Sequence, residues 1–268
     1  MLIIPIRDDS VMRRPPVFTY GVICACGAVF LWELGLSPRG LTSFSFSFGM
    51  IPAVLFGHAE LPSRLAIVPA WATVLTSMFV HGGWLHLLGN MLYLWLFGRG
   101  VESAIGSIRF SVLYMVSGVA AAMTQASTNS MAEVPMIGAS GAIAGALGAY
   151  LILHPRANVI LFIWIFIFVR LVSVPAVLLL ALWFATQLVS ALAASPDEPG
   201  VAFWAHVGGF VAGLVLVFLL RGRDVALFQA QRSSPFSVSR SEEVKWRTWS
   251  GSVPPAGNRS KKQRGPWR

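Results

Sequence analysis

Charged residues are scarce in this sequence. Asp, Glu, Lys and Arg make up 12% of the 268 residues, about half of the share that is usual in soluble domains. Hydrophobic residues make up 56%, and the mean hydropathy is +0.69. This composition excludes an ordinary soluble globular protein. It predicts an integral membrane protein.

Cysteine is also rare, with only Cys24 and Cys26. The two residues lie two apart in an apolar run and would point to different faces of a helix, so they indicate neither a disulfide nor a metal pair. Residues 1–16 are polar and lack the signal-peptide pattern of a basic start, an apolar run and a small-residue cleavage site. We therefore expect the first apolar run to remain in the mature protein.

Several catalytic motifs are missing. No His-Glu-x-x-His occurs, so a zinc protease of that type would lack its ligands. No pair of Asp residues lies within the apolar segments, which excludes an aspartyl mechanism. A metal site from His81, His86 and His206 would lack a carboxylate or Cys neighbour and is disfavoured. We expect no metal and no cofactor.

Six apolar segments are candidates for transmembrane helices. A hydrocarbon core about 30 Å thick requires roughly 20 apolar residues per helix. We expect an all-α membrane protein, a bundle of six transmembrane helices. The segments are Val17–Leu36, Trp84–Phe97, Phe110–Ala126, Ala139–Leu153, Val172–Leu192 and Val201–Leu220.

Positive residues near the ends of these segments predict the orientation, because loops rich in Lys and Arg stay in the cytoplasm. With six spans, both termini lie on the same side. The loops on the opposite side contain only Arg39 and Arg64. We therefore expect both termini in the cytoplasm, together with Arg7, Arg13, Arg14, Arg99, Arg109, Arg156, Arg170, Arg221 and Arg223.

The chain divides on this interpretation into a cytoplasmic segment at 1–16, a six-helix core at 17–221 and a tail at 222–268. From Arg221 onward, eleven Lys and Arg stand against three Asp and Glu, so this end carries nearly all of the net charge of +9. Its Ser, Pro and Gly without a sustained apolar period predict disorder. Anionic lipid of the cytoplasmic leaflet is the favoured partner of the tail, and no nucleic-acid binding is expected.

Two connecting segments are unusually apolar. Ser37–Gly83 contains stretches too short or too interrupted to cross, and we expect it to lie partly in the outer leaflet. Val159–Val169 has eleven residues, too few to cross as a helix, and is interpreted as an interfacial element or an extension of the fifth span. A seventh span would place the basic tail outside.

Small residues recur at helical spacing in the fourth and sixth segments. Gly141 and Gly145 form one small-xxx-small face, and Gly209 and Gly213 form another, which allows two helix backbones to pack closely in lipid. Helix packing alone would explain the glycines. However, Ser140 and His206 lie on or beside these faces, and a short Ser side chain needs such close packing to reach a His on another helix.

Three polar residues are predicted to lie at one depth. Ser140, His206 and His86 are each thirteen or fourteen residues from a cytoplasmic boundary, about 20 Å of helix. They would therefore lie roughly 10 Å below the outer face of the hydrocarbon core. The short fourth segment would also recess its amino end, where free N–H groups favour an oxyanion.

These residues suggest serine hydrolase chemistry. Ser140 is a candidate nucleophile and His206 its general base. His86 and Asn90 are four apart on one helix face and, with the Ser140 amide, could stabilise an oxyanion, although His86 alone could be a structural histidine. No acidic residue lies at the matching depth, since Glu33 and Glu102 are near span ends. A Ser-His dyad is therefore favoured over a triad.

The chain resembles the rhomboid intramembrane serine proteases over roughly Val17–Leu220. The resemblance rests on His81-x-x-x-x-His86-x-x-x-Asn90, Gly138-Ala139-Ser140-Gly141 and His206-x-x-Gly209-x-x-x-Gly213. It implies that Ser140 is the nucleophile, His206 the base, and His86, Asn90 and the Ser140 amide the oxyanion donors. His81, Gly138, Gly141, Gly209 and Gly213 would have supporting roles.

Two positions depart from this pattern. Many family members have Trp-Arg in the outer loop, whereas Trp71 is followed here by Ala72. Some members place an aromatic residue against the catalytic His one turn after the nucleophile, where this chain has Ala144. We expect another side chain to pack there.

The resemblance implies that the substrates are transmembrane helices of other membrane proteins, cut near their outer ends. The gate would be the fifth span or the loop Ala193–Gly200, whose Pro and Gly residues suit a mobile cap. The main alternative is a catalytically silent rhomboid-like protein that binds membrane helices; a small-solute transporter is disfavoured because no internal repeat is seen. A lone six-span core fits a bacterial plasma membrane.

Overall fold

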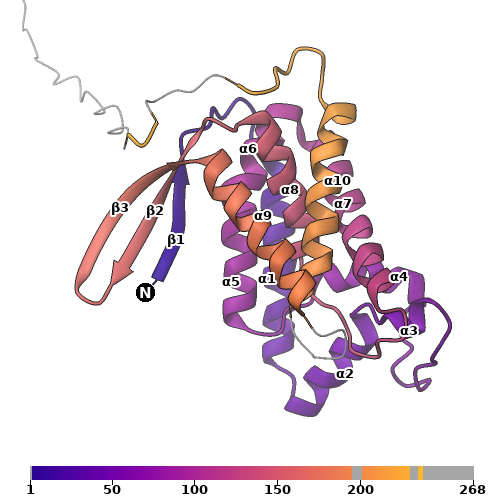
Figure 1. The fold of residues 1–268 in the computed structure, drawn as a ribbon. Helices are drawn as coiled ribbons and strands as arrows, with labels where there is room; N and C mark the ends of the chain where they lie inside the picture. Colours follow the sequence, from indigo (N-terminus) through magenta and orange to yellow (C-terminus); the bar gives the residue numbers. More distant parts are fainter. Residues whose placement is uncertain (1, 195–200, 230–234, 238–268) are drawn as a thin grey trace, which may run out of the picture. The chain divides into compact units, whose positions relative to one another are not determined.

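The computed structural model describes residues 2–194, 201–229 and 235–237 (Figure 1). Most of the predicted cap loop Ala193–Gly200 and most of the predicted tail at 222–268 fall outside these ranges. The helices are α1 (Val17–Leu34), α2 (Pro38–Phe48), α3 (Pro52–Leu55), α4 (Ala70–Thr76), the 3-10 turn η1 (Ser77–Phe79), α5 (Trp84–Tyr93), the π-helical turn η2 (Leu94–Gly98), α6 (Arg99–Ile105), α7 (Ser107–Thr128), α8 (Ser140–Leu153), α9 (Ala176–Ala193) and α10 (Phe203–Leu220). The strands are β1 (Leu2–Asp8), β2 (Asn158–Ile165) and β3 (Phe168–Pro175).

Within the described residues, four helices are long and apolar enough to cross a membrane: α1, α7, α9 and α10. The other two predicted spans are built differently. The second, Trp84–Phe97, covers α5 and the π-helical turn η2, and the fourth is the 14-residue α8. The count of six spans and the orientation of the termini therefore stay predictions.

Helix α8 is the centre of the bundle. Most of its residues are buried, and it contacts both α7 and α10. A Cβ atom on Gly209 or Gly213 of α10 would overlap the carbonyl oxygen of Gly141 or Gly145 on α8. The predicted close packing through these two pairs of glycines is confirmed, and it lets the backbones of α8 and α10 touch.

The start of α1 is capped by a residue from another helix. Its own N-cap position is Pro16, which supplies no side-chain cap. The carboxylate of Glu102, on α6, is fully buried and accepts hydrogen bonds from the N–H groups of Phe18 and Thr19, both at 2.8 Å. A carboxylate at a helix amino terminus satisfies free N–H groups and the positive end of the helix dipole. Glu102 therefore has a structural role.

The expectation of an all-α protein is wrong for two segments. Strands β1, β2 and β3 form an antiparallel sheet in that order, so that residues 2–8 pair with the segment after α8. Residues 159–169 are a β-hairpin and not a helical extension, and the fifth helix begins at Ala176, four residues later than predicted. The β-branched and aromatic residues of 159–172 favour strands. The two-residue turn Phe166–Ile167 lacks the Gly and Asn that announce a hairpin.

Candidate active site

The nucleophile candidate Ser140 is the first residue of α8. The loop before it is held in place because the Gly138 N–H donates to the carbonyl of Ser77 at 2.8 Å. Gly138 has φ = 115°, a conformation that residues with a Cβ rarely adopt. Because the first N–H groups of a helix have no partner within it, the Ser140 N–H is available as a hydrogen-bond donor.

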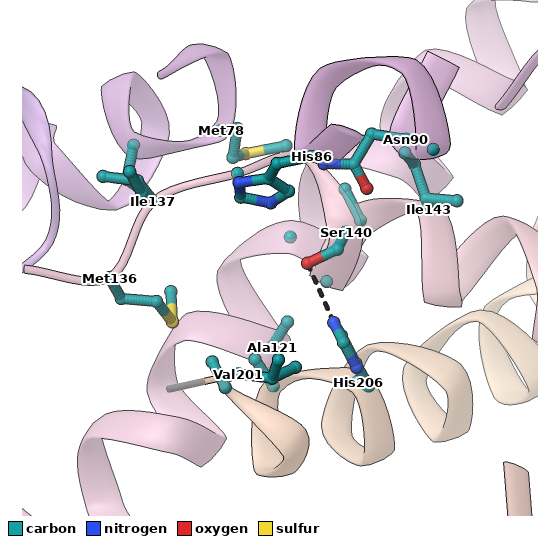
Figure 2. A pocket seen from close by; sticks show the side chains of 18 of the residues that line it. Met78, His86, Asn90, Ala121, Met136, Ile137, Ser140, Ile143, Val201 and His206 are labelled. Carbon is teal, nitrogen blue, oxygen red and sulfur yellow. Dashed lines mark hydrogen bonds between the residues drawn. The ribbon is translucent and has the colours of Figure 1, made fainter. Parts of the chain in front are cut away.

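His206, on the second turn of α10, reaches Ser140 directly. Its Nε2 atom lies 2.9 Å from Ser140 Oγ. Figure 2 marks this hydrogen bond with a dashed line. The contact of Gly141 with Gly209, one turn beyond His206, brings α8 and α10 close enough for this short bond. His206 is only 8% exposed. The structure thus brings the predicted nucleophile and base together.

The other ring nitrogen of His206 has a partner that sequence reasoning missed. Nδ1 lies 2.7 Å from Oε1 of Gln187, on α9. An amide oxygen only accepts, so this bond places the imidazole proton on Nδ1 and leaves Nε2 free to accept the Ser140 hydroxyl. An amide side chain within an apolar span was the available signal, since polar groups in lipid are costly without a partner.

An aromatic residue does pack against His206, but it comes from α9. The ring of Trp183 lies 5.9 Å from the imidazole, and Phe203 meets it edge-on at 6.4 Å. Trp183 thus supplies the aromatic contact that residue 144 does not. Trp183 and Gln187 are four residues apart and share one face of α9, so this helix contacts the imidazole twice.

The predicted oxyanion donors gather around Gly138. Gly138 has no Cβ; one added to it would lie 2.6 Å from His86 Nε2 and 3.6 Å from Asn90 Nδ2. Both side-chain nitrogens are therefore close to this glycine. The Gly82 N–H donates to His86 Nδ1 at 3.4 Å, which leaves the proton on Nε2. Asn90 Nδ2 is buried and has no hydrogen-bond partner among the residues that the structure describes. Two donors therefore point at the backbone just before Ser140.

His81 supports the loop before α5. It is buried, its Nδ1 lies 3.1 Å from the Phe79 carbonyl, and its ring lies 5.1 Å from that of His86. Its backbone N–H donates to the buried carboxylate of Glu33 at 3.2 Å. Glu33, predicted only to lie near a span end, thus helps to hold this loop.

A cavity of about 660 Å³ connects these groups, a size typical of ligand sites. Ser140, His206, His86, Asn90 and Trp183 all line it. In the parts of the chain that the structure covers, no group of three His, Cys, Asp or Glu residues could hold a metal ion. The long apolar helices define a multi-pass membrane protein. Its cavity brings together the Ser140 hydroxyl, the His206 imidazole and the N–H donors of His86 and Asn90.

Comparison with known proteins identifies the family. Residues 69–223, more than half of the chain, match the Rhomboid domain. The chain belongs to the rhomboid family, as its motifs predicted, and it is an integral multi-pass membrane protein.

Relatives come from plants, yeast and a bacterium. RHOMBOID-like protein 5 of Arabidopsis thaliana is 31% identical over 55% of this chain and 43% of its own length. Rhomboid protein 1, mitochondrial, of Saccharomyces cerevisiae is 30% identical over 56% of this chain and 40% of its own. Rhomboid protease GluP of Bacillus subtilis is 38% identical over 37% of this chain and 18% of its own. The chain thus spans about two fifths of the length of the first two relatives, and the group does not favour a bacterial plasma membrane over an organelle.

Proposed function

We propose that this protein is a serine endopeptidase that cleaves transmembrane helices within the membrane. The observation that carries the proposal is the 2.9 Å contact between Ser140 Oγ and His206 Nε2. The same cavity is lined by Asn90, whose Nδ2 has no partner within the described part of the chain. The similarity to a relative named as a protease, GluP, points the same way.

The geometry supports a two-step mechanism. Ser140 Oγ attacks the scissile carbonyl carbon while its proton passes to His206 Nε2. The carbonyl oxygen becomes an oxyanion near the Ser140 N–H, Asn90 Nδ2 and His86 Nε2, which act as donors. The C–N bond then breaks, and the proton on Nε2 moves to the leaving amine. Water, activated by the same imidazole, hydrolyses the acyl-enzyme.

Gln187 acts as a positioning residue in this proposal. When His206 becomes an imidazolium, its Nδ1–H keeps its acceptor, Gln187 Oε1. A neutral acceptor stabilises the imidazolium less than a carboxylate would. The site is therefore a Ser-His dyad in which the Gln187 amide orients the imidazole, as the Asp carboxylate does in a triad.

The substrates of this activity are membrane-spanning segments cut near their outer ends. Such a helix must unwind locally to expose a carbonyl, which favours small or helix-breaking residues at the scissile bond. Helix α9 is the proposed gate, because it lines the cavity through Trp183 and contacts the imidazole. The other gate candidate, the loop Ala193–Gly200, lies mostly outside the described residues.

The alternative is a protein that binds membrane helices in this cavity without cutting them. Cleavage of a labelled single-span substrate in proteoliposomes separates the two functions. Ser140→Ala and His206→Ala should each abolish cleavage, whereas Ser111→Ala, at a half-buried position of α7 that does not line the cavity, should not change it. Failure of the unaltered protein to cut several substrates, together with no fluorophosphonate labelling of Ser140, would favour binding.

A further inference from the structure

The tip of the β2–β3 hairpin, defined here as residues 164–169, is apolar and exposed. Its sequence is Trp-Ile-Phe-Ile-Phe-Val. Phe166 is 89% exposed and Ile167 is 86% exposed. Figure 1 shows the tip lying clear of the helices. So much contiguous exposed apolar surface marks a site of interaction with a protein or a membrane.

Both faces of the hairpin are apolar at this tip. Successive residues of a strand point to opposite faces, so the cross-strand pair Trp164 and Val169 lies on one face and the pair Ile165 and Phe168 on the other. All four side chains are exposed. A protein that packs on a sheet covers one face, whereas lipid contacts both. The two-sided pattern therefore favours lipid.

The turn itself is unsuited to water. Phe166 has φ = 51°, a left-handed conformation that hairpin turns normally assign to Gly, Asn or Asp. The indole N–H of Trp164 donates to the carbonyl of this Phe166, which satisfies two polar groups inside the tip. The tip thus combines a bulky residue at a turn position with a Trp whose N–H is satisfied internally, and the internal bond is what an apolar surrounding would require.

One charge marks the depth to which the tip can enter. Residues 158–175 contain no Asp or Glu, and their one charged residue is Arg170. Arg170 lies on β3, where it pairs with Ile163 of β2. Arg170 is three residues from Ile167, about 10 Å of strand. This distance matches the roughly 5–10 Å that interfacial elements penetrate. The guanidinium would then reach lipid phosphates while its stem lies along the apolar strand.

The hairpin continues directly into a surface that faces lipid. Strand β3 ends at Pro175 and α9 begins at the next residue. Leu178 and Leu182, in the first two turns of α9, are exposed in a protein that spans the membrane. The base of the hairpin therefore lies at the end of the bundle where α9 begins, beside the bilayer.

We propose that residues 164–169 insert into the interfacial region of the leaflet at this end of the bundle, with Arg170 bound to the phosphates of anionic lipids. The outer backbone edge of β3 has no strand partner in the sheet, and unpaired N–H and C=O groups are costly in hydrocarbon. The insertion therefore stops at the interface. This proposal depends on membership of the membrane family and not on protease activity.

Fluorescence depth measurement on the full chain in proteoliposomes tests the insertion. Ile167→Cys in a Cys24→Ser background is labelled with an environment-sensitive dye, and the background protein serves as the blank. Glu60→Cys, in an exposed loop, is the matched aqueous control. We expect blue-shifted emission at 167 that nitroxide lipids quench more strongly near the headgroup than deep in the chains, and neither effect at 60.

Two results would overturn the proposal. Water-like emission at 167 would mean that the tip is solvated. Blue-shifted emission without quenching by nitroxide lipids would mean that protein, such as a second copy, covers it.

The role of Arg170 has its own test. Adding phosphatidylglycerol to phosphatidylcholine vesicles should increase lipid quenching at 167, and Arg170→Gln should remove the increase. Arg223→Gln, an exposed arginine just beyond α10, is the control that should keep it. An increase that survives Arg170→Gln would refute the phosphate contact.

Discussion

Replacing Gln187 tests how the proposed base is held. The bond from His206 Nδ1 to Gln187 Oε1 selects the useful tautomer of a buried imidazole. Gln187→Met keeps the length of the side chain and removes the acceptor. Gln187→Glu restores an acceptor at the same reach. Gln187→Met should lower the rate of cleavage, and Gln187→Glu should preserve it.

The expected loss follows from the burial of Nδ1. An unsatisfied buried hydrogen-bond donor costs about 1–3 kcal/mol. Since each 1.4 kcal/mol is a factor of ten in rate, kcat should fall roughly 5- to 150-fold in Gln187→Met. This loss is far smaller than the roughly 10⁴-fold effect of altering the orienting carboxylate of a serine protease triad, because the amide is neutral. Substrate binding should change little, so KM stays nearly constant.

Two assays separate this role from a structural one. Steady-state cleavage in proteoliposomes gives kcat and KM, and the rate of fluorophosphonate labelling reports the reactivity of Ser140 without a substrate helix. Both rates should fall together in Gln187→Met and recover in Gln187→Glu. The control is Val189→Ala, which removes a lipid-exposed side chain of the same helix. Equal loss in the Met and Glu variants, or a change confined to KM, would refute the positioning role.

Three further outcomes are expected. Asn90→Ala should lower kcat about 10²- to 10³-fold at constant KM, as measured by steady-state kinetics, because it removes an oxyanion donor; an effect on KM alone would contradict this role. Gly209→Ala should destabilise the protein by about 1–3 kcal/mol in thermal unfolding in detergent, since its Cβ would overlap Gly141, whereas Gly27→Ala, which has open space, should not. Glu102→Gln should lower stability by about 1–3 kcal/mol in the same assay, because the N–H groups at the start of α1 lose a charged acceptor; an unchanged unfolding temperature would argue against the cap.

Local sequence patterns were sufficient for much of the site. Ser140, His86 and Asn90 lie in short motifs, and the prediction that Ser140, His86 and His206 share one depth comes from counting residues along helices, which have a constant rise. The packing of α8 on α10 was also predictable, because the spacing of Gly209 and Gly213 places both on one face of a helix.

The contacts of α9 could not be predicted. Gln187 and Trp183 meet His206 only because of the rotation of α9 about its own axis. Gln187 indicated that a polar partner exists, but most of this helix is apolar, so its sequence does not say which helix each face meets. The hairpin was missed for a related reason. A continuous apolar run has neither the alternation of a half-buried strand nor the period of an amphipathic helix, and its turn carries no Gly or Asn.

The sequence by itself determined the membrane class, the rhomboid family and the four polar residues of the proposed site, since composition and short motifs are local properties. Tertiary structure alone decided which groups orient those residues: Gln187 on the imidazole, Glu33 on the loop before α5, and Glu102 at the start of α1. It also decided that residues 2–8 pair with residues 159–164. These contacts join residues distant in sequence, and they depend on helix rotation and strand register, which an evenly apolar chain does not encode locally.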